Sequence, residues 1–221
     1  PGCYLPGMSK DARPHVVILG AGFAGLECAK ALKRAPVRVT LVDRQNHHLF
    51  QPLLYQVATA ALSPADIASP LRELLSPYEN ITVKMGEVVH IDKEKREITL
   101  GNGDCLGFDK LVIATGARHS YFGNDHWEEN APGLKTITDA LKIREKVLLS
   151  FEKAERLDSY KEAAKYLNFV IIGGGPTGVE MAGAIAEIAY KTMFQNFRKI
   201  KPEKARIYLI EGMSRILPPY P

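Results

Sequence analysis

The sequence predicts an α/β fold in which a parallel β-sheet has helices on both faces. Two segments, residues 15–43 and 168–211, each have the pattern of a strand, a glycine-rich turn, a helix and a second strand. In both segments the second strand ends on an acidic residue, which is Asp43 in the first and Glu211 in the second. Because a helical crossover joins two parallel strands, the repeated pattern predicts two Rossmann-like dinucleotide-binding units in one chain.

The first unit opens with the apolar run 16–19, which is typical of a buried parallel strand. Three glycines follow at once in G-x-G-x-x-G spacing: Gly20, Gly22 and Gly25. The first permits a tight turn, the second lets the backbone approach a pyrophosphate, and the third lets helix and strand pack closely. The expected helix over 26–32 directs its free N–H groups and positive dipole end at the phosphates. A strand over 37–42 then brings Asp43 to where its carboxylate can accept hydrogen bonds from a ribose.

Residues 45–65 contain no Lys, Arg, Asp or Glu. An uncharged loop with aromatic residues is suited to line a flat apolar ligand, and Gln51 would supply a polar contact. The composition of this stretch supports an alternative equally well, in which an apolar loop and a short helix merely cover the sheet and contact no ligand. For His47 and His48 a structural role is favoured, because no partner acid or cysteine is evident.

The next part of the chain predicts a small antiparallel β unit inserted into the parallel sheet. A short helix over 66–76, with Pro70 near its start, precedes several short strands over 81–100 and a turn at 101–103. A further buried strand over 108–116 ends in small residues.

A polar, turn-rich stretch leads to a helix from 139 to about 156, for which Thr138 is the expected N-cap. The strand over 168–172 then opens the second unit, and its glycines repeat the first spacing: Gly173, Gly175 and Gly178. A helix over 179–197 follows, with an apolar face that has little sheet to cover it. The strand over 206–210 ends in Glu211, so the unit predicts a second nucleotide.

Composition narrows the class of protein further. The chain has 221 residues, of which 46% are hydrophobic and 24% charged, so it can form a core. A net charge of +4 is too mild to indicate nucleic-acid binding but suits anionic cofactors. The three cysteines form no C-x-x-C pair, which argues against a redox-active dithiol or a metal cluster. No apolar run is long enough to cross a membrane.

These features together resemble the type II NADH dehydrogenases, the single-subunit NADH:quinone oxidoreductases of the two-dinucleotide flavoprotein superfamily. The resemblance rests on the two glycine motifs, the strand end Ala114-Thr115-Gly116, the stretch NHHLFQPLLYQVATAALSP at 46–64 and RILPPYP at 215–221. It covers residues 13 to 221.

The resemblance implies that the first unit holds FAD. The residues implied are Gly20, Ala21, Gly22, Phe23, Ala24, Gly25, Asp43, Arg44, Gln51, Val88, Ala114, Thr115 and Gly116. Asp43 would bind the adenosine ribose, Gln51 would lie near the flavin, and the Val88 backbone near the adenine. The second unit would hold NADH through a second set: Gly173, Gly175, Pro176, Thr177, Gly178 and Glu211.

Glu180 matches a family acid that is placed beside nicotinamide and flavin and helps proton transfer during quinone reduction. An ordinary first-turn glutamate, favoured by the helix dipole, explains the residue equally well.

The implied reaction passes a hydride from NADH to FAD and then two electrons to a membrane quinone, without proton pumping. The implied setting is the cytoplasmic face of a bacterial inner membrane, with no nucleic-acid partner and with a homodimer left open. Two alternatives remain: another flavin-dependent reductase with ferredoxin, sulfide or oxygen as acceptor, or a nucleotide-sensing flavoprotein without turnover.

The expected domain organisation has four parts: a non-native leader at 1–7, an FAD-binding domain at 8–125, a helical connection at 126–166, and an incomplete NADH-binding unit at 167–221. Members of the family continue past residue 221 into a membrane-binding region. We therefore expect an N-terminal fragment that does not turn over alone.

Overall fold

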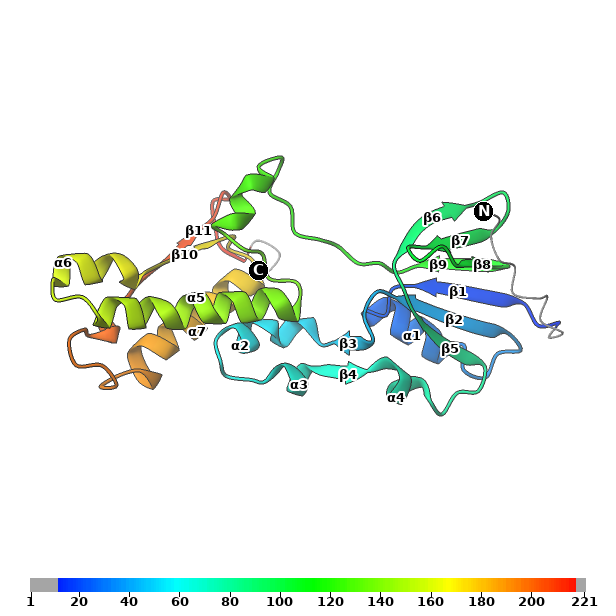
Figure 1. The fold of residues 1–221 in the computed structure, drawn as a ribbon, viewed down its shortest axis with the longest axis horizontal. Helices are drawn as coiled ribbons and strands as arrows, with labels where there is room; N and C mark the ends of the chain where they lie inside the picture. Colours follow the sequence, from blue (N-terminus) through cyan, green and yellow to red (C-terminus); the bar gives the residue numbers. More distant parts are fainter. Residues whose placement is uncertain (1–11, 218–221) are drawn as a thin grey trace. The chain divides into compact units, whose positions relative to one another are not determined.

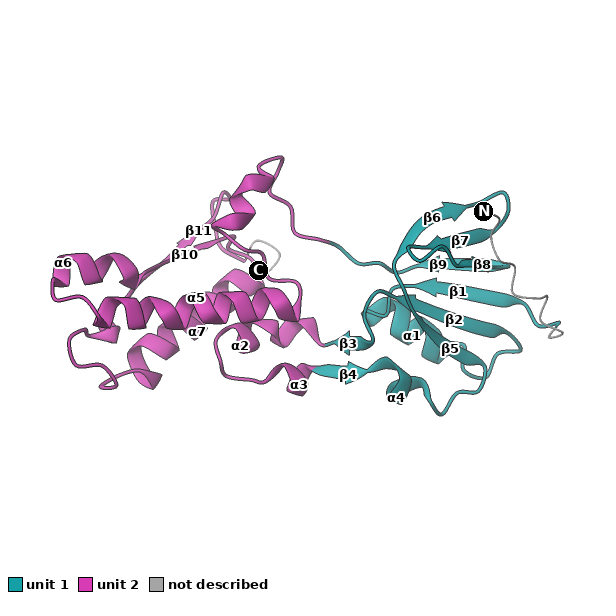
Figure 2. Cartoon of the chain, viewed as in Figure 1, with its two compact units in different colours: residues 1–49, 68–117 teal, residues 50–67, 118–221 magenta. Residues whose placement is uncertain are grey.

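The computed structural model describes residues 12–217, and the chain forms two compact units (Figures 1 and 2). Unit 1 comprises residues 1–49 and 68–117, and unit 2 comprises residues 50–67 and 118–221. The predicted leader at 1–7 and the last four residues of the RILPPYP motif lie outside the described residues. The chain therefore passes between the units at three points.

Unit 1 is built on a four-stranded parallel sheet with the strand order β5-β2-β1-β9. Its strands are β1 (His15–Leu19), β2 (Arg38–Asp43), β5 (Ile81–Met85) and β9 (Lys110–Ile113). Every residue of β1 is buried, as the apolar run predicts for a central strand with both faces covered.

The two faces of this sheet have different covers. Helices α1 (Phe23–Ala31) and α4 (Leu71–Leu75) pack on one face. The other face carries an antiparallel sheet of β6 (Val88–Asp92), β7 (Glu97–Leu100) and β8 (Cys105–Gly107), whose Ile98 and Leu100 pack on the parallel strands. The predicted α/β fold with an antiparallel insertion is confirmed, but in unit 1 the second face of the parallel sheet carries this antiparallel sheet in place of the expected helices.

The placement of residues 81–86 in the antiparallel part is wrong. β5 pairs with β2 in parallel, and its buried residues Ile81 and Val83 alternate with more exposed ones. The alternation follows from its position as an edge strand of the parallel sheet. A half-buried edge strand gives the same pattern as an antiparallel strand, so the sequence alone does not separate them.

The helix expected over 66–76 is divided into three elements. These are α3 (Pro64–Ile67), β4 (Ala68–Pro70) and α4, and β4 pairs antiparallel with β3 (His47–Leu49). Pro70 has an extended conformation and directly precedes α4. A proline disfavours the helical region for the residue before it, which explains the interruption.

Unit 2 contains the parallel pair β10 (Asn168–Ile172) and β11 (Arg206–Ile210), both with the predicted bounds. Its main helices are α5 (Ile137–Glu155) and α7 (Pro176–Glu187), and α7 passes into a π-helical turn, η4 (Ile188–Thr192). The short elements of residues 50–67, η1 (Gln51–Leu53), α2 (Leu54–Ala58) and α3, also belong to this unit.

The apolar face of α7 is better covered than the sequence indicates. Met181 and Ile185 are buried, and α2 packs against both α7 and α5. Helix α2 contributes buried Leu54 and Val57 to this part of unit 2. The uncharged stretch after β2, which includes α2, thus covers the apolar face of α7 that the sequence predicts to be largely uncovered.

The N-cap of α5 is Thr136, and the prediction of Thr138 is wrong. The Asp139 backbone N–H donates to the Thr136 hydroxyl at 3.1 Å, and the Thr136 N–H donates to the Asp139 carboxylate at 2.9 Å. This reciprocal capping box starts the helix two residues earlier than expected, because the acid must lie three residues after the cap.

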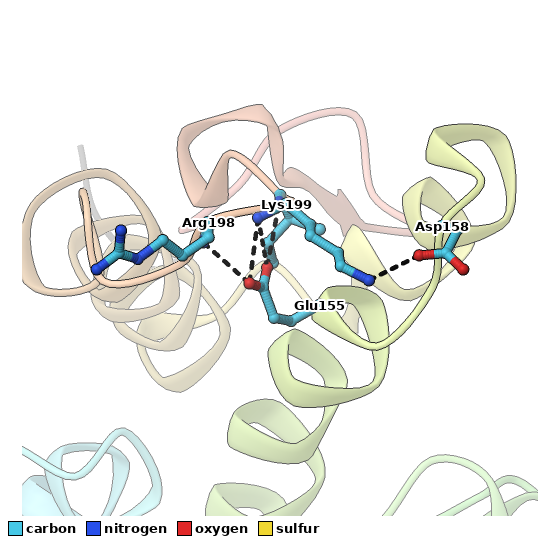
Figure 3. A network of polar contacts seen from close by, with 5 residues as sticks. Glu155, Asp158, Arg198 and Lys199 are labelled. Carbon is cyan, nitrogen blue, oxygen red and sulfur yellow. Dashed lines mark hydrogen bonds and ion pairs between the residues drawn. The ribbon is translucent and has the colours of Figure 1, made fainter.

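The last residue of α5 holds the chain that follows the π-helical turn (Figure 3). The Glu155 carboxylate accepts the backbone N–H groups of Arg198, Lys199 and Ile200 at 2.9 to 3.1 Å. Lys199 also extends its ammonium group to Asp158 at 2.7 Å. One carboxylate therefore orders three successive backbone donors.

Within the part of the chain that the structure describes, no helix combines the length and the apolar character needed to span a bilayer.

Candidate functional site

The first glycine turn (residues 20–25) has the geometry that its spacing predicts. Gly20 has a φ of +95°, and its N–H donates to the Val42 carbonyl at 2.8 Å. A Cβ on Gly20 would meet the Ala114 carbonyl oxygen, and a Cβ on Gly25 would meet the Gly20 carbonyl oxygen. A Cβ on Gly22 would meet nothing within 4 Å, so this side of the turn is open to a ligand.

Asp43 ties the first glycine turn to the end of β2. Its Oδ2 accepts the Ala21 N–H at 2.6 Å, and its Oδ1 accepts the Gln45 N–H at 2.7 Å. A carboxylate has about four lone-pair sites, so acceptor capacity remains for a ribose hydroxyl. Asp43 thus holds the turn through backbone hydrogen bonds, a role that the sequence did not indicate.

His48 contacts the same turn from β3. Its Nδ1 lies 2.9 Å from the Ala21 carbonyl oxygen, and its ring stands edge-on to Phe23 with centroids 5.1 Å apart. With the Nδ1–H tautomer, the imidazole donates to that carbonyl. This agrees with a structural role, but the partner is a backbone oxygen, which residue types alone cannot indicate.

The remaining residues implied for FAD lie in unit 1, apart from Gln51. Ala21 is buried, whereas Phe23 and Ala24 are exposed on the first turn of α1. The small residues Ala114 to Gly116 come directly after β9. The Ala114 N–H donates to the carbonyl of Leu19, and this bond places the segment beside the first glycine turn. Two further residues are exposed Arg44, directly after Asp43, and half-buried Val88 at the start of β6.

The second glycine turn (residues 173–178) repeats the first one closely. Gly173 has a φ of +106° and donates its N–H to the Ile210 carbonyl at 2.8 Å. A Cβ on Gly178 would meet the Gly173 carbonyl oxygen, whereas one on Gly175 would meet nothing within 4 Å. Pro176 opens α7 at a position where its missing N–H costs no helical hydrogen bond.

Glu211 has the same place in unit 2 as Asp43 in unit 1. Its Oε1 accepts the Met213 N–H at 2.9 Å, and its Oε2 accepts the Gly174 N–H at 2.6 Å. The backbone N–H groups of Met213 and Gly174 lower the pKa of the Glu211 carboxyl below its usual value. Glu211 is therefore an anion at neutral pH, with acceptor capacity left for a ligand.

Both turns fit the pyrophosphate group of a dinucleotide cofactor. Each has an open face at its second glycine, and neither α1 nor α7 has an acidic side chain in its first turn. The positive end of each helix dipole is therefore not neutralised from within the helix, and it favours a phosphate.

A cavity of about 180 Å³ in unit 2 joins three segments of the chain. We call it the Glu180 cavity, and its lining residues are Gln51, Pro52, Leu54, Tyr55, Leu134, Lys135, Thr177 and Glu180. It brings together Gln51, Thr177 and Glu180, which the sequence named for different parts of the site.

The Glu180 cavity also contains two polar residues that sequence reasoning missed. The Tyr55 hydroxyl accepts the Gln56 Nε2–H at 3.1 Å, which leaves its own proton available to donate. Lys135 adds a cation from the segment just before α5. Neither lies in a recognisable motif, and only the packing of α2 and α5 in one unit places them near Glu180.

The fold and the two glycine turns define a protein with two dinucleotide-binding units. The family model for pyridine nucleotide-disulphide oxidoreductases matches residues 14–221, and the chain belongs to this family.

Within that family the chain is similar to type II NADH:quinone oxidoreductases, as its motifs indicate. It is 48% identical over 217 residues to Ndh of Mycobacterium tuberculosis, a match that spans 97% of this chain and 47% of that protein. NdhA of the same organism is 47% identical over 94% of this chain and 45% of that protein. The chain thus spans about half the length of the curated relatives it matches.

Solved structures agree with this similarity. NDH2 from Plasmodium falciparum in complex with NADH has a TM-score of 0.85 at 29% identity, covering 95% of this chain and 44% of that chain. The sulfide:quinone oxidoreductase of Aquifex aeolicus has a TM-score of 0.66 at 24% identity over 90% of this chain and 43% of that chain, which shows the fold alone.

Proposed function

We propose that this chain is the nucleotide-binding part of an FAD-dependent NADH:quinone oxidoreductase. The enzyme passes a hydride from NADH to FAD and then two electrons to a quinone, and it moves no protons across the membrane. The observation that carries the proposal is the pair of matching glycine turns, each tied to an acid at the end of the neighbouring strand. The similarity to two mycobacterial type II NADH:quinone oxidoreductases and to the NADH complex of NDH2 from Plasmodium falciparum supports this proposal.

The first glycine turn is assigned to FAD. The open face at Gly22 lets the backbone approach the pyrophosphate, and the start of α1 offers its unpaired N–H groups. Asp43 accepts from the ribose with the lone pairs that Ala21 and Gln45 leave unused. When bound, the flavin supplies the acceptance of a hydride and its onward transfer as electrons.

The second glycine turn is assigned to NADH. Gly175 takes the place of Gly22, and the start of α7 faces the pyrophosphate. The charged Glu211 carboxylate accepts from the ribose 2′-hydroxyl and repels a 2′-phosphate, which favours NADH over NADPH.

The Glu180 cavity is assigned to proton handling, because a quinone needs two protons with its two electrons. The Glu180 carboxylate holds a proton and passes it on, the Tyr55 hydroxyl donates from the side that Gln56 leaves open, and Gln51 orients the reacting ring. The Lys135 ammonium stabilises negative charge that develops in the cavity.

The proposed location is the surface of a bacterial inner membrane, on its cytoplasmic face. The support is chemical, because a lipophilic quinone is reached at the bilayer, and two mycobacterial relatives are named for quinone reduction. Three expectations from the sequence remain predictions: a homodimer, the domain division at 125/126 and 166/167, and the lack of turnover by residues 1–221 alone.

The test uses protein made from the complete reading frame. Bound flavin is identified after release, NADH oxidation is followed with a soluble quinone, and NADPH, ferredoxin, sulfide and oxygen are compared with these substrates. Stoichiometric FAD with quinone-dependent NADH oxidation is expected. Binding of both nucleotides without reduction of any acceptor would favour a nucleotide-sensing protein and contradict the proposal.

A further inference from the structure

A second cavity in unit 2, of about 220 Å³, lies at the end of the sheet opposite the second glycine turn. We call it the basic cavity, and its lining residues are Tyr160, Lys161, Ala164, Lys165, Leu167, Asn168, Lys204 and Arg206. Asn168 and Arg206 are the paired first residues of β10 and β11, whereas Gly173 follows the last residue of β10. Five residues of strand separate the two ends by roughly 15 Å, so the basic cavity is a separate site.

Four cations from two distant segments converge on this cavity. Lys161 and Lys165 come from α6 (Tyr160–Ala163) and η3 (Ala164–Leu167), while Lys204 comes from η5 (Pro202–Lys204) and Arg206 from β11. The fold brings these segments together, since they do not form one basic run in the sequence. Like charges that share a cavity repel one another, and an anion in the cavity removes that repulsion.

The charge of the basic cavity is largely uncompensated by the protein. Lys165 pairs with Glu162 at 2.6 Å, but among the described residues no carboxylate forms an ion pair with Lys161, Lys204 or Arg206. The neighbouring Lys199 is different, because Asp158 neutralises it (Figure 3). The three remaining charges therefore face the cavity without a partner acid in this part of the structure.

We propose that the basic cavity binds a small anion with two or more phosphate groups. The planar guanidinium of Arg206 matches the geometry of a phosphate, and the lysines add point charges around it. The volume corresponds to about seven water molecules, which is more room than a single phosphate needs. The ring of Tyr160, 59% exposed at the rim, gives a surface on which a planar part of the ligand can stack.

Calorimetry with inorganic pyrophosphate, at low ionic strength, tests this proposal on the purified full chain. The cavity variant is Lys161→Gln with Lys204→Gln, and the matched control is Lys142→Gln with Lys153→Gln, which removes two exposed lysines of α5 outside the cavity. Because a hydrogen bond to a charged group is worth about tenfold or more in affinity, the cavity variant should bind at least tenfold more weakly. The control should stay within about twofold of the unaltered protein.

Saturating NADH should not displace pyrophosphate from the basic cavity. If the cavity variant and the control variant lost affinity for pyrophosphate equally, net charge alone would explain the binding. Displacement by NADH would assign the binding to the second glycine turn. Either result overturns the proposal, as does the absence of binding. Unchanged melting temperatures confirm that the variants are folded.

The source of the phosphates is identified with phosphatidylcholine vesicles made with and without cardiolipin, a lipid whose headgroup carries two phosphates. Sedimentation that needs cardiolipin and is lost only in the cavity variant supports the site with a lipid headgroup as ligand. Pyrophosphate binding without such sedimentation supports the basic cavity as a binding site whose ligand is a free phosphorylated compound.

Discussion

Replacing Asp43 with alanine should loosen the first glycine turn even before FAD is present. The carboxylate accepts two backbone N–H groups at 2.6 and 2.7 Å, from Ala21 and Gln45. A hydrogen bond to a charged group contributes about 1.5–3 kcal/mol when it is well protected. Asp43 is only half-buried, so solvent screening reduces the sum for the pair to roughly 2–3 kcal/mol of unfolding free energy.

Urea unfolding of the FAD-free protein measures this loss directly, and fluorescence titration with FAD measures the further loss of the ribose contact. Asp43→Asn is the matched variant, because its amide keeps one acceptor oxygen and should keep about half of the stability. Glu211→Ala is the control for the FAD titration only, since it removes the matching carboxylate from the second glycine turn and leaves the first glycine turn unaltered. If Asp43→Ala lowered FAD affinity without any change in the stability of the FAD-free protein, the tether from Asp43 to Ala21 would have no energetic role.

Three further predictions concern the turns and the Glu180 cavity. Gly25→Ala should destabilise the protein by about 1–3 kcal/mol, because its Cβ meets a backbone oxygen. Gly22→Ala should leave the melting temperature unchanged and weaken FAD binding, because its Cβ meets nothing within 4 Å. Equal melting temperatures of the two variants would contradict this difference between the glycines. The Glu211 carboxyl has a lowered pKa, so its stabilisation is present above its unfolded pKa of about 4.3 and is lost as pH falls through the folded value. Glu211→Gln should therefore be less stable than the unaltered protein at neutral pH and equal to it in strong acid, and a difference that persists in acid would refute the assignment. In Glu180→Gln, stopped-flow reduction of the flavin by NADH should stay near normal while reoxidation by quinone slows. Unchanged reoxidation would contradict a role of Glu180 in proton transfer; because Glu180 lies beyond the first turn of α7, the helix dipole does not explain it either.

The sequence predicts those parts of the fold that local patterns determine. Apolar runs, glycine spacing and terminal acids place β1, β2, β10 and β11 within one residue of their observed bounds, because each pattern is complete within a short segment. The turn geometry at Gly20 and Gly173 follows from the same local information, since a positive φ at these positions favours glycine.

The missed features of the candidate site depend on contacts between distant segments. Membership of residues 50–67 in unit 2 depends on the packing of α2 against α5 and α7, and this packing also determines the Glu180 cavity. Tyr55 and Lys135 become site residues only through that packing. The partner of His48 is a carbonyl, which every residue has, so no pattern of side chains could predict it.

The interleaving of the two units imposes an order on synthesis. All of unit 1 has been made once Ala117 is in place, whereas α2 must wait for α5, which ends at Glu155. At about 5–20 residues per second, the ribosome needs on the order of ten seconds to pass from α2 to the end of α5. During that interval Leu54 and Val57, which the finished protein buries, have no helix to pack against. Until α5 has been synthesised, the nascent chain therefore exposes an apolar segment that the finished protein buries.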